Sequence, residues 1–330
     1  WGDFNYYTRD DKDQIISVTS APQSGYSTRK MNAGLIRNRG VELSLGGMPV
    51  STKNWKWEMN FNIAKNSNKL VELADGVDSY SIYWTSFTTR LYNYAMVGKS
   101  LGVITGNTWE RDDNGNIIFH ELSASQKALY GGEYVPTYNQ NTLDELGNFH
   151  PDFTGGFNTS ISFKNFRLSA NIDFSVGGQI VSYTNMWGSS SGILDKTAEL
   201  NDRGVNVREP VSKGGGIHMT GVDQDGNKVD TYVNAKLYYT TASRVWEEWV
   251  YDRTYVKLRE VSLSYVFPSQ TLKKLNIGLS RASVAINASN PWLIYSACPN
   301  VDVSEIGMGY FEGGNAAATR SIGFTVNLAF

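Results

Sequence analysis

The chain contains three histidines, His120, His150 and His218, and a single cysteine, Cys298. None of the histidines stands at metal-ligand spacing from a second histidine or from the cysteine. We therefore predict no metal centre, and we interpret the histidines as surface residues. One cysteine forms no disulfide within its own chain.

Two polar segments, DDNGN at Asp112–Asn116 and DQDGN at Asp223–Asn227, are similar to the beginning of a calcium-binding loop. Neither continues to the bidentate acid that closes a twelve-residue calcium loop. Asp, Asn and Gly also favour the left-handed backbone of tight turns, and turns are the prediction here. The sequence has no phosphate-binding glycine motif and no nucleophile elbow, and acids such as Asp173 have no paired acid or base nearby in the sequence. We predict neither an enzyme nor a cofactor.

Aromatic residues in the expected loops are the strongest candidates for ligand binding. Aromatic faces stack on sugars and on peptide side chains, and Trp and Tyr also anchor protein interfaces. The alternative is that these rings pack the long loops against themselves or form an aromatic girdle. The residues that we predict to contact ligand are Tyr83, Trp84, Trp187, Tyr239 and Trp246.

The elements that would position these loops are strands, and the clearest pair lies within Phe153–Val176. Apolar and polar residues alternate through 157–163 and again through 166–176, with Lys164-Asn165 between them. This pattern predicts a hairpin with a two-residue turn. Each arm has roughly 10 to 12 residues, the length that a tilted strand needs to cross a hydrocarbon layer.

The rest of the chain continues the same pattern and predicts ten strands. Connections alternate between short and long, as in outer-membrane barrels with short turns on one side and long loops on the other. A change of phase within Val250–Phe267 predicts a β-bulge near Arg259-Glu260. The ten predicted strands are Trp1–Arg9, Leu35–Leu45, Trp55–Ala64, Arg90–Val97, Val103–Arg111, the two arms of the hairpin, Val250–Phe267, Leu275–Ser289 and Thr319–Phe330.

Composition and charge restrict the class of protein. Lys and Arg number 30 against 32 Asp and Glu, so no basic surface is available to bind nucleic acid. No apolar run approaches the roughly 18 to 20 residues of a transmembrane helix, so a closed barrel is the way such a chain would span a bilayer. The fold class predicted is all-β, an antiparallel transmembrane barrel without an internal domain boundary over residues 1–330. Because no signal peptide or initiator methionine precedes Trp1, we expect a fragment.

Several segments together resemble the SusC/RagA-type TonB-dependent transporters of Bacteroidota outer membranes. They are NAGLIRNRGVEL (Asn32–Leu43), WKWEMNFNIAKNSNKLVEL (Trp55–Leu73), NFHPDFTGGFNTSISFKNFRLS (Asn148–Ser169), YVKLREVSLSYVFP (Tyr255–Pro268) and the terminal SIGFTVNLAF. One departure is PNVDVSE at Pro299–Glu305, where the family more usually has Asp-Pro-Glu.

The resemblance implies about ten C-terminal strands of a 22-strand barrel, with the plug domain and the remaining strands outside this chain. It also implies a SusD-like surface lipoprotein as partner, energy from TonB through the absent N-terminal part, contact with outer-membrane lipid, and uptake of glycans or oligopeptides. The aromatic C-terminal residue, Phe330, would be an assembly signal for barrel insertion. The rival hypotheses are a self-contained outer-membrane barrel hydrolase and a soluble β-sandwich that binds carbohydrate.

Overall fold

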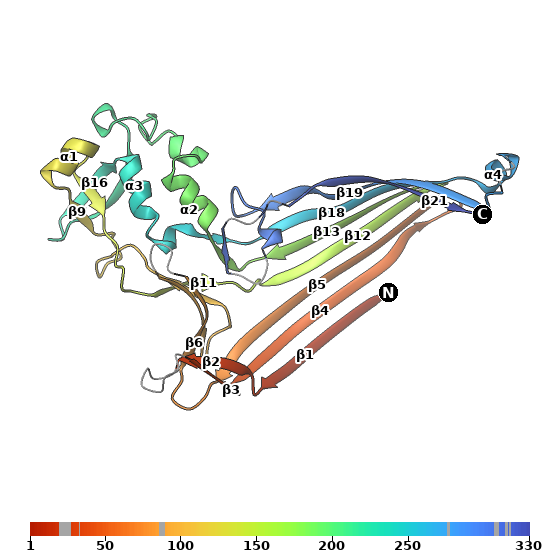
Figure 1. Cartoon of the computed structure of the whole chain (residues 1–330), viewed down its shortest axis with the longest axis horizontal. Helices are drawn as coiled ribbons and strands as arrows, with labels where there is room; N and C mark the ends of the chain where they lie inside the picture. Colours follow the sequence, from red (N-terminus) through yellow and green to blue (C-terminus); the bar gives the residue numbers. More distant parts are fainter. Residues whose placement is uncertain are drawn as a thin grey trace.

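The computed structural model describes residues 1–19, 28–32, 34–85, 90–275, 278–306, 310–313, 316 and 318–330. Its main element is an antiparallel sheet of eight long strands in the order β1-β4-β5-β12-β13-β18-β19-β21 (Figure 1). Their bounds are β1 (Gly2–Lys12), β4 (Leu35–Ser51), β5 (Trp55–Glu72), β12 (Phe153–Phe163), β13 (Phe166–Val176), β18 (Tyr255–Val266), β19 (Arg281–Ser296) and β21 (Ser321–Ala329). The edge strands β1 and β21 do not pair with each other among the described residues.

The alternating pattern forms these strands as expected. Every residue of β12 from Phe153 to Phe163 pairs with one of β13, and the turn between them holds Lys164 at a φ of 53°. The bulge is confirmed, because Leu258 pairs with Ile172 and Glu260 with Asn171, which leaves Arg259 as the extra residue. The C-terminal strand begins close to its predicted start.

Two strand predictions were wrong in their placement. β7 (Leu91–Met96) and β8 (Val103–Gly106) belong to a separate four-stranded sheet, and β5 pairs directly with β12. β8 is buried on both faces and β7 has every second residue buried, so neither presents an apolar face to lipid. Short and long connections still alternate with eight strands, because removing two strands leaves the number of strands even.

A third prediction misplaced the start of a strand. Residues Ser269–Leu275 form a short helix, α4, and β19 begins only at Arg281. β19 also continues through Pro291 to Ser296, where the sequence predicts a loop. Proline is tolerated there because the register shifts opposite this part of β19, between Leu258 and Glu260 of β18.

The long connections fold together into a second body at one end of the sheet, which we call the cap (Figure 1). It includes parts of the segments 73–152, 177–254 and 297–320. Its strands are β6 (Ser79–Thr85), β7, β8, β9 (Phe119–Glu121), β10 (Tyr134–Pro136), β11 (Asp144–Asn148), β14 (Gln179–Ser182), β15 (Ile217–Val222), β16 (Lys228–Val233), β17 (Val250–Asp252) and β20 (Phe311–Glu312). Its helices are α1 (Ala124–Tyr130), α2 (Tyr183–Ser190), α3 (Ala235–Ala242), and the short 3₁₀ turns η2 (Asp195–Ala198), η3 (Val211–Lys213), η4 (Trp246–Trp249) and η5 (Val303–Glu305). A small hairpin of β2 (Ile15–Thr19) and β3 (Thr28–Asn32) lies beside β1 and β4.

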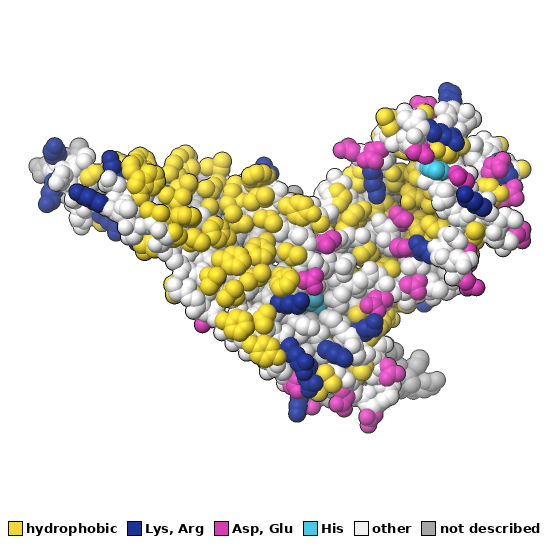
Figure 2. All heavy atoms as spheres, turned by 180° about the vertical axis from the view of Figure 1, so that it is seen from behind, with side chains coloured by type: hydrophobic (Ala, Val, Ile, Leu, Met, Phe, Trp, Pro, Cys, Tyr) yellow, Lys and Arg dark blue, Asp and Glu magenta, His cyan; other side chains and the backbone are white. Residues whose placement is uncertain are grey.

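The cap has a conventional hydrophobic core. Residues distant in sequence, such as Leu91, Met186, Trp246 and Tyr310, are buried against one another. The main sheet shows the opposite arrangement, because its apolar side chains are exposed. Figure 2 shows them covering the face of the sheet turned toward the viewer. No helix among the described residues is long and apolar enough to cross a lipid bilayer.

Candidate functional site

The second face of the main sheet is polar, and its residues lie in rows that the strand register fixes. One row runs through Glu58, Ser160, Ser169, Ser262 and Asn287 of five successive strands. Ser262 Oγ donates to Asn287 Oδ1 at 2.6 Å. The row carries hydroxyl, amide and carboxylate groups, so this face is built to contact water or a polar solute.

The next row toward the cap is rich in amides, with Asn60, Asn158 and Asn171 opposite one another and Glu260 at its end. A hollow of about 270 Å³ lies over these two rows. Asn side chains offer both donors and acceptors, which suits a neutral polymer or a peptide backbone. In the first row Ser160 Oγ donates to Glu58 Oε2 at 3.4 Å, and the same carboxylate is paired with Lys56 and Arg167.

The bulge on β18 adds a charged side chain to the polar face. In a regular strand Lys257 and Arg259 would share one face, with Glu260 on the other. The extra residue brings Glu260 to the polar face as well. Arg259 binds Asp173 through two bonds, of 2.8 Å from Nε and 2.9 Å from Nη2, and it also pairs with Glu305.

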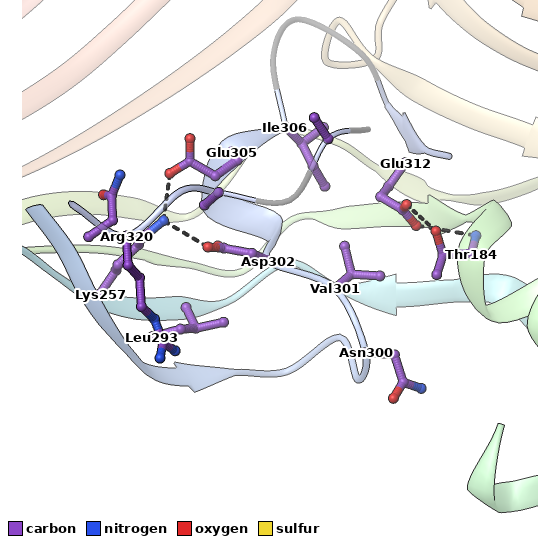
Figure 3. A pocket seen from close by; sticks show the side chains of 13 residues that line it. Thr184, Lys257, Leu293, Asn300, Val301, Asp302, Glu305, Ile306, Glu312 and Arg320 are labelled. Atoms are coloured by element: carbon purple, nitrogen blue, oxygen red, sulfur yellow. Dashed lines mark hydrogen bonds and ion pairs between the residues drawn. The ribbon is translucent and has the colours of Figure 1, made fainter. Parts of the chain in front are cut away.

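A charged cluster forms where the polar face meets the cap (Figure 3). Lys257 Nζ donates to Asp302 Oδ2 at 2.7 Å, to Glu305 Oε1 at 2.5 Å and to Ser304 Oγ at 3.0 Å. The three acceptors belong to η5 and the residue before it, in the connection between β19 and β21. Lys257 is 1% exposed, and these partners replace the water that its ammonium group loses on burial. The cluster therefore fixes the η5 loop against the wall of the sheet.

Both acids of the η5 loop have a lowered pKa. For Glu305 the main cause is the hydrogen bond from Lys257, and Arg259 adds to it. For Asp302 burial acts to raise the pKa, but the hydrogen bonds from Lys257 and Ser304 outweigh it, so the pKa lies below its ordinary value. Both carboxylates are charged at neutral pH and are fully engaged in holding the loop.

A cavity of about 340 Å³ lies beside this cluster and extends to the cap. On the cap side Glu312, 4% exposed, accepts hydrogen bonds from Ser182 Oγ at 2.7 Å and from the Thr184 hydroxyl. Figure 3 shows Glu312 and Thr184 on one side of the cavity and Lys257 with its partners on the other. The cavity thus borders both the sheet and the cap.

The predicted aromatic ligand contacts have different environments. Trp246 is 1% and Tyr239 8% exposed, and both pack in the cap core, where the Tyr239 hydroxyl donates to the Lys196 carbonyl. These two rings pack the long loops against themselves, which was the alternative to ligand contact. Trp187, on α2, is 43% exposed. Tyr83 and Trp84 lie on β6, and their side chains are outside the described part.

The remaining sequence motifs behave as structural elements. Asp112 accepts hydrogen bonds from the backbone of Asn114 and Asn116, and Asp223 accepts them from Asp225 and Asn227, so both acidic segments are tight turns. Within the described residues no group of three or more His, Cys, Asp or Glu side chains is placed to hold a metal.

Sequence reasoning missed the charged cluster. Lys257 and Glu305 are separated by 48 residues, and no local pattern joins them. Two signals were present: the cations Lys257 and Arg259, two residues apart beside a predicted bulge, and the unusual PNVDVSE segment that supplies Asp302 and Glu305.

Long antiparallel strands with an apolar outer face, a polar inner face and long connections folded at one end define a segment of a transmembrane β-barrel. No protein-family model matches the chain. TonB-dependent receptor P3 of Formosa agariphila is 27% identical over 307 residues, which is 91% of this chain and 28% of the receptor. TonB-dependent receptor P26 of the same bacterium is 24% identical over 362 aligned residues, covering all of this chain and 33% of the receptor. TonB-dependent receptor SusC of Bacteroides thetaiotaomicron is 30% identical over 188 residues, 54% of this chain and 18% of that receptor.

Solved structures agree on the fold. The RagAB peptide importer in its closed-closed state matches with a TM-score of 0.69 at 18% identity, over the whole of this chain and 33% of the matched chain. Its open-open state also gives 0.69, at 17% identity and 32% of the matched chain. The chain thus spans about a third of the length of the relatives it matches. The resemblance to SusC/RagA-type TonB-dependent transporters, predicted from sequence, is confirmed.

Proposed function

We propose that this chain forms part of the wall and the outer cap of a TonB-dependent importer in the bacterial outer membrane. The single observation that carries the proposal is the opposite polarity of the two faces of the main sheet. Leu168, Leu263 and Ile286 are 46% to 48% exposed on one face, although large aliphatic side chains are normally buried. Lipid is the environment in which such a face is stable.

The polar face then lines the route of the transported solute. Its amide and hydroxyl rows bind solute by hydrogen bonds rather than by net charge, which fits a glycan or an oligopeptide. The importers named among the matches include a peptide importer. The amide row could bind an oligopeptide as well as a glycan. The η5 loop borders this route, because the charged cluster holds it at the cap end of the wall.

We assign the cap to contact with a surface lipoprotein of the SusD type. Three apolar side chains on one stretch of the cap remain exposed: Trp187 at 43%, Ile193 at 77% and Leu200 at 68%. Exposed apolar residues, and Trp above all, are typical anchors of protein interfaces. Phe330 remains the proposed assembly signal; it is 86% exposed and follows the end of β21. TonB and the plug would act through parts of the transporter outside this chain.

The wall assignment is tested with two single cysteine variants in the full-length transporter, Ile172→Cys and Asn171→Cys. Cys298 is buried and stays silent in both. A membrane-embedded apolar thiol reagent should label the first variant, and a small water-soluble reagent should label the second. If the Ile172→Cys thiol is shielded from lipid reagents while Asn171→Cys reacts in detergent-free buffer, the apolar face packs against protein and the proposal fails.

Transport is tested by uptake of labelled oligopeptides and oligosaccharides in cells with and without the gene, before and after collapse of the proton gradient. We expect accumulation of one class of solute that needs both the gene and the gradient.

The partner assignment is tested by copurification of a lipoprotein with the triple variant Trp187→Ser, Ile193→Ser and Leu200→Ser. The control is Val97→Ser, another exposed apolar residue (41%). Full retention of the lipoprotein by the triple variant would contradict the anchor role.

A further inference from the structure

The apolar face of the main sheet contains a groove of about 300 Å³ near the end opposite the cap. It spans β13, β18, β19 and β21, and its lining is almost entirely apolar. The strand register explains its position, because two neighbouring cross-strand rows meet there. The main lining residues are Phe166, Leu263, Tyr265, Val284, Ile286 and Phe324.

Aromatic rings surround the end of this groove farther from the cap. The rings of Phe166 and Tyr265 are 4.7 Å apart, and Phe267 packs edge-on against Tyr265 at 5.1 Å. Aromatic side chains are enriched at the level where lipid headgroups meet the acyl chains. The groove therefore runs from the hydrocarbon region to the headgroup region of the leaflet on the short-turn side.

Three lysines lie in the short connections that follow the aromatic ends of β12 and β18. Lys164, in the turn after β12, places its ammonium 5.3 Å from the centre of the Phe163 ring, on the apolar face. Lys273 and Lys274 are exposed on α4, while Leu272 of the same helix is 3% exposed and packs inward. Figure 2 shows dark blue side chains gathered at the end of the molecule where α4 lies, next to the apolar field.

No acid neutralises these lysines within the turns themselves. The connecting segments 52–54, 164–165 and 267–280 contain four lysines and neither Asp nor Glu. The acids of the charged cluster lie at the cap end of the sheet, and Glu58, nearer the short turns, is already paired with Lys56 and Arg167. An apolar groove that ends in aromatic rings and unneutralised cations matches the shape and charge of one amphipathic molecule.

We propose that this groove binds an anionic phospholipid, with an acyl chain along the groove and the phosphate headgroup at Lys164, Lys273 and Lys274. The inference rests on the proposed function, because it requires the apolar face to be turned to lipid. It adds a specific lipid class and a defined place on the wall. The site would hold one lipid in the leaflet on the short-turn side while other lipids exchange freely.

The test uses the full-length transporter in nanodiscs of dioleoyl phosphatidylethanolamine with a minority of dioleoyl phosphatidylglycerol. The lipids retained after gentle transfer to detergent are counted by native mass spectrometry. Wild-type protein should retain phosphatidylglycerol preferentially. Each of Lys164→Gln, Lys273→Gln and Lys274→Gln should lower this preference by about five-fold, the equivalent of about 1 kcal/mol for each lysine at an anionic surface.

Lys53→Gln is the matched control, since Lys53 also lies in a short turn, the one between β4 and β5, which borders the Lys164 turn but joins strands that contribute no residue to the groove. It should leave the preference unchanged. Val284→Phe, which fills the groove without altering charge, should reduce retention of both lipids. Excess sn-glycerol 3-phosphate should not displace the bound lipid, and displacement would show that the lysines bind phosphate without the acyl chain.

Equal retention of the two lipids, or equal effects of Lys53→Gln and Lys273→Gln, would overturn the inference while leaving the importer intact. Failure of the importer assignment has a different signature, because the Ile172→Cys thiol would then be shielded from membrane-embedded reagents.

Discussion

The main sheet and the cap use the same kinds of side chain in opposite ways. In the cap, Trp246 and Met186 are at most 1% exposed and stabilise the fold by leaving water. In the sheet, Ile286 and Phe324 are 48% and 78% exposed, and the groups turned inward are Ser, Asn and charged residues. This opposite burial is what the proposed importer requires, with water around the cap and lipid around the wall.

The junction between the two regions follows neither pattern. Here the structure buries the charge of Lys257, which pairs with Asp302 and Glu305. The partly exposed Arg259 extends the cluster by pairing with Glu305 and Asp173. Burying charges costs desolvation energy, so such a cluster contributes geometry more than net stability. The cluster holds the η5 loop in one position, because its hydrogen bonds are directional and apolar contacts are not.

The largest expected effect lies in the cap. Trp246→Ala removes one of the two fully buried tryptophans of the core and should lower the free energy of unfolding of the cap by about 3 to 5 kcal/mol. Because the wall does not share this core, limited proteolysis should cut the cap while the strands stay protected. Trp187→Ala, at a site 43% exposed, is the control and should change little. Simultaneous loss of the wall would show that the two regions are one cooperative unit.

The next effect lies in the wall, where the direction of burial is reversed. Ile172→Arg places a charge in lipid and should cost about 2 to 4 kcal/mol near the midplane of the bilayer, whereas Asn171→Arg on the polar face should be nearly neutral. The measurement is the urea midpoint of the full-length protein refolded into lipid vesicles. Equal effects at these neighbouring positions would remove the distinction between the two faces.

The sequence predicted the wall well because its evidence is local. In β12 and β13 the alternation of apolar and polar residues indicates on which face of the sheet each side chain lies, and the turn between the two strands is short. Even the bulge at Arg259 was visible as a change of phase. The short strands β7 and β8 were assigned to the wrong sheet for two reasons: β8 is buried on both faces and has no alternation, and the alternation of β7 does not indicate which sheet it joins.

The site could be predicted only in part, because its partners meet through the fold. Asp173, Lys257 and Asp302 come from three segments whose proximity depends on the pairing of β13 with β18 and on the return of the η5 loop. The aromatic residues were chosen by type alone, and type does not distinguish the buried Trp246 from the exposed Trp187. Burial inside a long connection is a tertiary property.

A third prediction concerns pH at the junction. The folded pKa values of Asp302 and Glu305 lie below their ordinary values of 3.8 and 4.5, so their contribution is complete above those ordinary values and is lost as the pH falls through the lower, folded values. The free energy needed to open the η5 loop should therefore fall in acid. The decrease should be about 1 to 2 kcal/mol, because both acids are partly exposed. Hydrogen exchange of residues 297–306 from pH 7 down to about pH 2, with β12 as reference, measures this opening. Glu305→Gln should open the loop already at neutral pH; unchanged exchange in that variant would contradict the role of the cluster.

The smallest effect is expected at the outer surface of the cap, with the opposite pH sign. His218 Nε2 lies 2.8 Å from Asp230 Oδ1 and its Nδ1 lies 2.8 Å from Asp202, while its ring stacks on Tyr232. The hydrogen bond to Asp230 is the main cause that raises the pKa of His218 above 6.5, with Asp202 adding to it. A raised folded pKa means that this contribution is complete below pH 6.5 and disappears as the pH rises through the folded value.

Hydrogen exchange of β15 and β16 should increase slightly from pH 6 to pH 9, beyond the intrinsic change measured on β12. The increase is small because the His218 side chain is 35% exposed and its ion pairs are screened. His218→Gln should remove the pH dependence and Asp202→Asn should weaken it, whereas a dependence that survives in His218→Gln would assign it to another group.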